Sequence, residues 1–171
     1  MVALALPAQS TQPVEQFTAT ALTRASSAVR TSIEIDIHRW SDQSKATNWL
    51  RPFRRSGVEA ALRELAGHPS VRQLRSISGL SRTIRYARDS RFTGGSRYFL
   101  LLVDPFTSEE FFQGTTSPGG ELAAIAIWLG KIGEGEGQIA EGSRIGIDAF
   151  GAVTVDVREP IIVLPTVGRP R

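Results

Sequence analysis

The stretch 97–105 constrains the fold of this chain more than any other. It reads Arg-Tyr-Phe-Leu-Leu-Leu-Val-Asp-Pro, so successive residues on both faces of a strand are apolar. A strand with one solvated face would alternate apolar with polar side chains. A Gly-Gly pair precedes the stretch and Asp-Pro ends it, which gives it strand length. We expect a central strand whose Phe99, Leu101 and Val103 face a β core, with helices covering its other face.

Other segments also have the period and composition of short strands. In one of them Ile33, Ile35 and Ile37 alternate with polar residues, which is typical of a half-buried strand. In the segment 81–92, Ile84 and Tyr86 are expected on one face, although arginines that recur every three residues leave a helix open as an alternative. The predicted strands are 14–23, 29–40, 71–77, 81–92, 97–105, 122–129, 138–148, 152–157 and 161–164. The glycine-rich segment 133–137 is expected to form a turn, and 161–164 an edge strand between two prolines.

Two helices are predicted between the second and third strands. Ser41 or Asp42 can cap the first, and Pro52 ends or bends it. The second begins with a capping box from Ser56 to Glu59, followed by an apolar stripe that contains Leu62. A shorter capped turn is expected at 107–112, where Thr-Ser-Glu-Glu precedes two phenylalanines.

These elements predict one domain, because 171 residues is the size of a single domain. The expected class is α+β, mainly antiparallel β, with about eight strands in a barrel or sandwich and an inserted helical pair packed on it. The boundaries are a flexible N-terminus at 1–13, a β-rich domain at 14–167 with its helical insertion at 42–67, and a loose tail at 168–171. The apolar start of the N-terminus is either the end of a signal peptide or a loose terminus.

Composition narrows the classes of site. The chain has no cysteine, which removes disulfide frameworks, thiolate zinc sites and cysteine nucleophiles. Its charge is divided, with +8 in residues 1–98 and −5 in residues 99–171. Seven arginines in the stretch 72–97 resemble a phosphate-binding run, but an acidic second half can neutralise them within the fold. We therefore expect no nucleic-acid partner, and the chain has no segment long and apolar enough for a transmembrane helix.

Few residues suggest chemistry. Glu34, Asp36 and His38 share one strand face but are spaced too far apart along it to form a metal site without further ligands, so a solvated face is the preferred interpretation. The segments 130–137 and 142–146 lack the context of a phosphate loop and of a nucleophile elbow. No catalytic, cofactor-binding or metal residue is assigned. The candidates for a ligand or acid–base site are His38, Asp36, Tyr86, Arg85 and Arg88.

Several segments together resemble a group of uncharacterised, mostly exported bacterial proteins. The resemblance is carried by Phe17-Thr-Ala, Ile37-His-Arg-Trp-Ser-Asp, the Ser56-capped helix, Ile84-Arg-Tyr-Ala-Arg and Gly133-Glu-Gly-Glu-Gly. It implies export to the periplasm or the exterior, with a cytoplasmic location as the alternative. The group has no known activity, so the resemblance implies no functional residue.

The expected function is non-catalytic: an exported module that binds a small apolar ligand or a protein partner, without a cofactor. The first alternative is an isomerase or hydrolase that uses a barrel cavity, with His38 or Tyr86 as its acid–base group. The second is a polyanion binder that uses the arginine run 72–97. A pocket with convergent polar groups would favour the enzyme, whereas a closed and filled barrel would favour a partner-binding or structural role.

Overall fold

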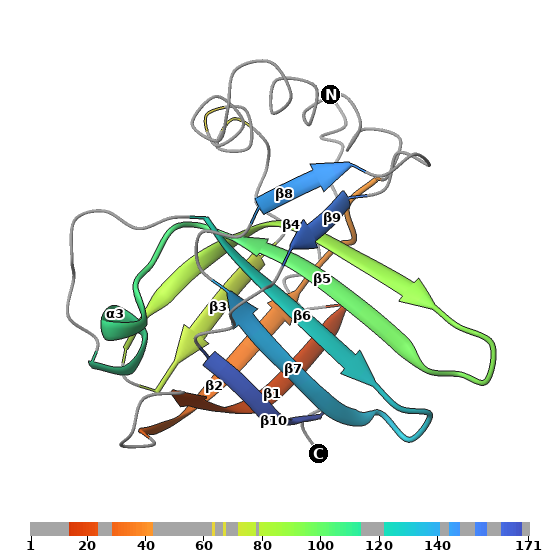
Figure 1. Ribbon diagram of the computed structural model, residues 1–171, viewed down its shortest axis with the longest axis horizontal. Coiled ribbons are helices and arrows are strands. Elements are labelled where there is room, and N and C mark those ends of the chain that lie inside the picture. The colour runs from red at the N-terminus through yellow and green to blue at the C-terminus, as the bar shows by residue number, and fades with distance from the viewer. Residues whose placement is uncertain are drawn as a thin grey trace, which may run out of the picture.

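The chain forms a closed barrel of eight antiparallel strands, seen in a computed structural model (Figure 1). The strands follow one another around the barrel in the order β1, β10, β7, β6, β5, β4, β3, β2. Their bounds are Glu15–Thr23 (β1), Arg30–Ile37 (β2), Arg72–Ser76 (β3), Ser81–Arg91 (β4), Arg97–Val103 (β5), Ala123–Leu129 (β6), Glu134–Ala140 (β7) and Ile162–Gly168 (β10). Strands β8 (Arg144–Ile147) and β9 (Val153–Asp156) form a separate antiparallel pair. The predicted antiparallel β architecture is confirmed, and of the two forms expected, a barrel or a sandwich, the structure is the barrel.

The structure describes residues 14–23, 29–42, 63, 67, 72–77, 79–113, 122–140, 144–147, 153–156 and 162–168. Within these residues α3 (Ser108–Gln113) is the one helix with defined bounds. The predicted helical pair at 42–67 is therefore not supported. Of that stretch beyond Asp42, only Arg63 and Gly67 are described, both helical and exposed, and its key residues Ser56 and Leu62 lie outside the described part of the chain.

The barrel closes because the first and last strands pair with each other. β1 pairs with β2 on one side and with β10 on the other. The strands from β2 to β7 pair in the order of the sequence, and β10 pairs with β7. Arg97 on β5 pairs directly with Arg91 at the end of β4. When the paired residues are followed from Arg97 in the other direction, from strand to strand around the barrel, the path returns to β4 at the start of that strand. This displacement along β4 is the stagger that tilted strands need in order to close a barrel. The partners on that path are Leu129, Gly135, Val167, Ala19, Ile33 and Ser76.

Strand β5 is covered on both faces, as its sequence predicts. Phe99, Leu101 and Val103 belong to the core inside the barrel, and Leu100 and Leu102 are buried on its outer face. The inward set is the β core that was expected. The residues expected to form helices over the outer set lie, except for Asp42, Arg63 and Gly67, outside the described part of the chain.

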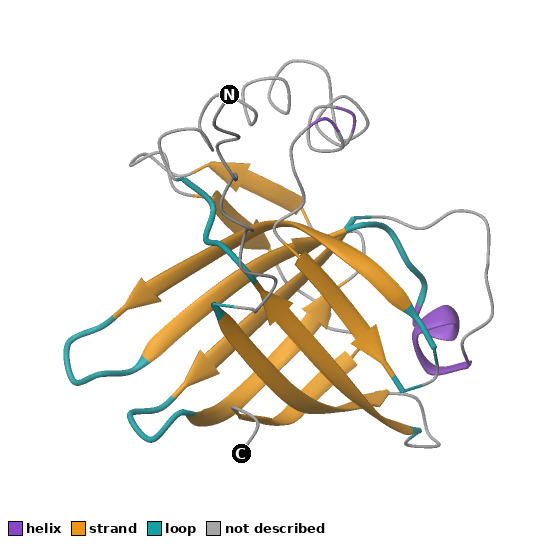
Figure 2. Cartoon of the chain, turned by 180° about the vertical axis from the view of Figure 1, so that it is seen from behind, coloured by secondary structure: helices purple, strands orange, loops and turns teal. Residues whose placement is uncertain are grey.

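The two ends of the barrel differ (Figures 1 and 2). The β4–β5 and β6–β7 turns project at one end, and helix α3 lies at the other. Phe106 and Phe111 stack at 5.4 Å beside this end and belong to the same core as the barrel interior. Helix α3 thus continues the apolar core beyond the strands.

A capping box fixes α3 as its sequence predicts. The Thr107 hydroxyl accepts a hydrogen bond from the Glu110 amide at 3.2 Å, and the Thr107 amide donates to the Glu110 carboxylate at 2.9 Å. The same carboxylate is buried and accepts a hydrogen bond from Arg82 at 3.0 Å. Two otherwise orphan amides and one buried charge are satisfied together.

The side chains of β4 do not all point to the faces of the strand that the sequence predicts. A register irregularity between Ile84 and Tyr86 inserts one extra residue opposite β5. Ile84 therefore points into the core, whereas Tyr86 points outward beside Leu102, and the two were predicted on one face. A bulge reverses the alternation of side chains because the side-chain period of a strand is two.

Two predictions about strand ends are also wrong. Gly135 and Gly137 lie inside β7 rather than in a turn, and only Gly133 of that segment has a positive φ, of 83°. A side chain at Gly135 would overlap backbone atoms of Trp128 and Leu129, so this position excludes a Cβ for reasons of strand packing. The last strand is not an edge strand, because β10 pairs with both β1 and β7. It passes Pro165 at a register shift, since proline has no amide to donate to a ladder.

Candidate functional site

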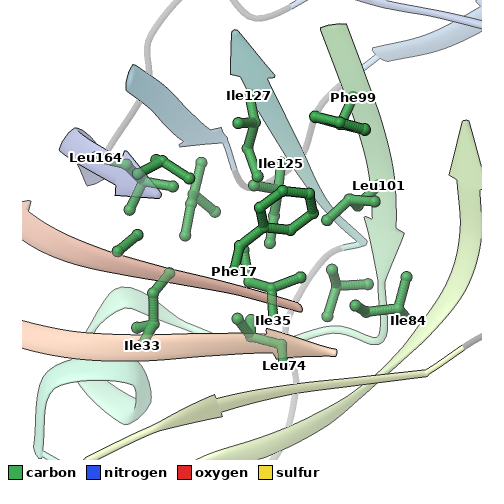
Figure 3. Close-up of a cluster of buried hydrophobic side chains, with 14 of the residues drawn as sticks. Phe17, Ile33, Ile35, Leu74, Ile84, Phe99, Leu101, Ile125, Ile127 and Leu164 are labelled. Atoms are coloured by element: carbon green, nitrogen blue, oxygen red, sulfur yellow. The ribbon is translucent and has the colours of Figure 1, made fainter. Parts of the chain in front are cut away.

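The barrel interior is filled by apolar side chains. The side chains labelled in Figure 3 come from β1 to β6 and from β10 and point toward one another. A side chain that lined a void large enough for water would keep accessible surface there. Ten central side chains are each at most 1% exposed: Phe17, Ile33, Ile35, Leu74, Ile84, Phe99, Leu101, Ile125, Ile127 and Leu164. The part of the interior that these residues form leaves no room for a ligand.

A charged cluster spans the barrel above this core. Arg97 on β5 donates to both carboxylate oxygens of Glu15 on β1, at 3.0 and 2.9 Å, although the two strands lie on opposite sides of the barrel. It also donates to both oxygens of Asp89, at 3.2 and 2.8 Å. Its guanidinium lies 4.5 Å above the Phe99 ring, and Trp40 stacks on that ring at 5.5 Å. This arrangement closes the lumen with paired charges and aromatic rings.

The protonation of this cluster follows from its pairing. Burial raises the pKa of Asp89, but hydrogen bonds from Arg97 and Arg91 outweigh it and bring the pKa below its ordinary value. Burial lowers the pKa of Arg97, and the hydrogen bonds to Glu15 and Asp89 more than compensate. Asp89 and Arg97 are thus held in their charged forms, which suits a structural ion cluster rather than an acid–base catalyst.

Most arginines of the run 72–97 form ion pairs with carboxylates of the same chain. Of the six members whose side chains are described, five bind carboxylates. Two of the five bind acids of the second half, as the divided charge predicts, and the other three bind acids of the first half. The pairs are Arg75 with Asp36, Arg82 with Glu110, Arg85 with Asp104, Arg91 with Asp89, and Arg97 with Glu15 and Asp89. Paired guanidinium groups have little left to offer a phosphate backbone, so this geometry weighs against a polyanion site.

Three of the five candidates predicted from the sequence, Asp36, Arg85 and His38, lie on β2, on β4 and in the bend after β2, respectively. Asp36 on the outward face of β2 is buried and hydrogen-bonded to Arg75, and its second oxygen has no hydrogen-bond partner among the residues that the structure describes. Arg85 donates two hydrogen bonds to Asp104, at 2.7 and 2.9 Å, and these raise its pKa. His38 is half-buried in the bend after β2, next to the segment in which Ser41 exchanges hydrogen bonds with Ala87.

The other two candidates are neighbours on the outward face of β4. Tyr86 is buried, and burial raises its pKa to about 12 even though the nearby Arg88 charge lowers it. The same two causes, in the same order, leave the pKa of Tyr98 above its ordinary value. The Nε atom of Arg88 is buried and has no hydrogen-bond partner within the described structure. Arg88 thus lies between two tyrosines with part of its donor capacity unused.

Beside Arg88 the outer wall becomes accessible. Tyr98 and Trp128 are direct cross-strand partners on β5 and β6, with ring centroids 5.2 Å apart, and Trp128 is 42% exposed. Phe92 and Ile132 are exposed in the two adjacent turns. We call Arg88, Phe92, Tyr98, Trp128 and Ile132 the aromatic surface. It contains three of the six large apolar side chains that are exposed among the described residues: Phe92, Trp128 and Ile132.

Sequence reasoning missed Tyr98, Trp128 and Ile132. Trp128 lies in an apolar run that reads as buried on both faces, and its outward neighbours Ala124 and Ala126 are indeed buried. The alternation of side chains along β6 predicts that Trp128 points outward. Whether Trp128 is exposed depends on how far the residues that cover the outer face extend.

Within the described residues no group of three or more His, Asp or Glu side chains could hold a metal ion, and no helix could cross a membrane. No protein-family model matches the chain, and no curated protein or solved structure is significantly similar to it. The implied export therefore stays a prediction.

Proposed function

We propose that this protein is a non-catalytic binding module that recognises a protein partner through the aromatic surface. The observation that carries the proposal is the filled barrel. A packed interior provides a rigid scaffold and no internal binding volume, so recognition falls to the outer wall.

The composition of the aromatic surface supports this role. Tryptophan, tyrosine and arginine are the residues that most often dominate the binding energy of protein interfaces. Tyr98 and Trp128 hold each other in place across two strands, so little side-chain entropy would be lost when a partner covers them. A rigid, partly exposed aromatic pair beside a cation is therefore well suited to anchor a partner.

Arg88 specifies the chemistry of the partner. Its Nε donor is buried and lacks an acceptor among the described residues, and an unmet donor in such surroundings costs about 1–3 kcal/mol. A carboxylate from the partner would meet a guanidinium that the barrel acids leave unpaired. We therefore propose a partner segment with an apolar or aromatic side chain for Trp128 and an aspartate or glutamate for Arg88.

The other hypotheses have less support. A small apolar ligand or a substrate inside the barrel would have to displace the ten buried side chains that fill it. Catalysis by His38 or Tyr86 would also need a pocket in which polar groups converge. Export and the helical pair at 42–67 remain proposals. Such a pair would give Leu100 and Leu102 the cover that their burial on the outer face requires.

Selection from a random peptide library displayed on phage tests the function. Binding to the wild-type protein should enrich peptides that combine an apolar residue with an acid. Trp128→Ala should weaken their binding about 30-fold, the effect of a typical interface anchor. Ile77→Ala is the matched control, because Ile77 is 78% exposed and lies outside the aromatic surface. Failure to enrich any peptide, or equal binding to Trp128→Ala, would contradict the proposal.

A further inference from the structure

We propose that a groove on the outer wall of the barrel binds a free aliphatic polyamine. The groove lies over β2, β1 and β10, reaches β7, and encloses about 410 Å³. It is distinct from the aromatic surface and shares no residue with it. The side chains that the argument uses are Thr18, Thr20, Ser32, Glu34, Glu134 and Thr166.

The groove exists because one cross-strand row lacks a side chain. Glu34, Thr18, Gly168 and Glu134 are register partners on four successive strands. The outer face at Gly168 is open, and a Cβ placed there would meet no atom within 4 Å. The row is therefore hollow near its middle and has an acid at each end.

The floor of the groove is rich in unused hydroxyl groups. Thr20 pairs with Ser32 on one side and with Thr166 on the other, and this row adjoins Thr18. None of these four hydroxyls makes a side-chain hydrogen bond to any residue that the structure describes. Each hydroxyl offers two acceptor lone pairs. The threonine methyl groups and the exposed Ile77 provide apolar contact beside them.

The charge of the groove selects a cation. Its described lining contains Glu34 and Glu134 but no lysine or arginine. Arg75 lies 3.7 Å from Glu34, but it binds Asp36 more closely. Glu134 makes no ion pair within the described structure. An anion would be repelled here, and an ammonium group would find both acids and hydroxyl acceptors.

The spacing of the acids favours more than one ammonium group. Glu34 and Glu134 stand three strand spacings apart, or roughly 14 Å between their backbones. That separation excludes a metal ion held by both carboxylates, since metal–oxygen bonds are about 2–2.6 Å long. A polyamine with ammonium groups at both ends of a methylene chain can reach both acids while its methylenes cross the threonine methyl groups. A sugar would more typically find an aromatic platform, and no aromatic residue is among the described lining residues.

Calorimetric titration with spermidine at low ionic strength tests the proposal. The wild-type protein should bind at one saturable site. Gly168→Val should weaken binding at least tenfold, because it fills the hollow, while the melting temperature should not fall, because the new side chain enters open space. Glu134→Gln should weaken binding about two- to fivefold, as expected for the loss of one exposed ion pair.

The matched control is Glu136→Gln, an equal change of charge on the same strand but outside the groove. It should leave spermidine affinity unchanged. An equal loss with Glu136→Gln would mean diffuse attraction to acidic surface and would overturn the proposal. So would unaltered binding by Gly168→Val, no spermidine binding, or tighter binding of a lysine-containing peptide of the same charge.

Discussion

The pairing of β6 with β7 can be tested by adding one methyl group at each of three glycines. A Cβ at Gly135 would overlap the carbonyl oxygen of Trp128 and would lie 2.9 Å from the Leu129 Cα atom. Both obstacles are backbone atoms of a paired strand, so they cannot rotate away. Gly137 is less confined, because its Cβ would lie 2.7 Å from the Ala126 oxygen and 3.2 Å from two movable side-chain atoms. Gly168 has open space.

The expected free energies follow this order. Gly135→Ala must force the strands apart, which adds the loss of one or two ladder hydrogen bonds, at about 1 kcal/mol each, to an overpacking cost of about 1–3 kcal/mol. We expect about 2–5 kcal/mol of destabilisation in total. Gly137→Ala should cost about 1–3 kcal/mol. Gly168→Ala should stabilise by about 0.4–1 kcal/mol, because alanine restricts the unfolded chain.

Urea denaturation of the three variants measures these differences, with the slope of each transition confirming that the unfolded state is comparable. All three changes are chemically identical, so the ranking depends only on the surroundings. If Gly135→Ala were as stable as Gly168→Ala, the register of β6 and β7 would be wrong, and with it the outward direction of Trp128.

Three further predictions concern the buried charges and phenols. Arg97→Met should cost about 3 kcal/mol in urea denaturation, because it removes the cation that binds two nearly buried carboxylates, Glu15 and Asp89. Arg91→Met should stay within about 0.5 kcal/mol, since the Arg91 side chain is 77% exposed against 15% for Arg97, and equal effects would show that the cluster is not structural. The pKa of Asp89 is lower in the folded protein than in the unfolded chain, where it is about 4, so its ionised carboxylate stabilises the fold at pH values above about 4, and this stability is lost as the pH falls through the folded pKa. Asp89→Asn should therefore flatten the acid side of a plot of stability against pH, and an unchanged acid side would contradict this. The chain has two tyrosines, Tyr86 and Tyr98, and both have raised pKa values, so an absorbance titration should show no phenolate step centred at pH 10. Because the unfolded chain loses these protons at a lower pH than the folded protein, stability should fall as the pH rises from the ordinary tyrosine pKa toward about 12.

The sequence by itself determined the elements whose signals are local. The alternation at Ile33, Ile35 and Ile37 and the doubly apolar β5 gave strands with the correct inward faces. The capping box at Thr107 and Glu110 gave α3. These signals are reliable because side-chain period and capping depend on residues a few positions apart. Closely spaced strands also predicted an antiparallel barrel or sandwich, and the pairing of the first strand with the last made it a barrel.

Only the tertiary structure decided what depends on register. The bulge in β4 turned Tyr86 outward, and packing against β6 placed Gly135 inside a strand. Arg97 met Glu15 across 82 positions of sequence because strand tilt brings opposite strands to the same level of the barrel. The filled interior, the aromatic surface and the groove at Gly168 likewise arise where separate strands align. A one-residue change of register moves every side chain to the other face, so no local pattern can specify such sites.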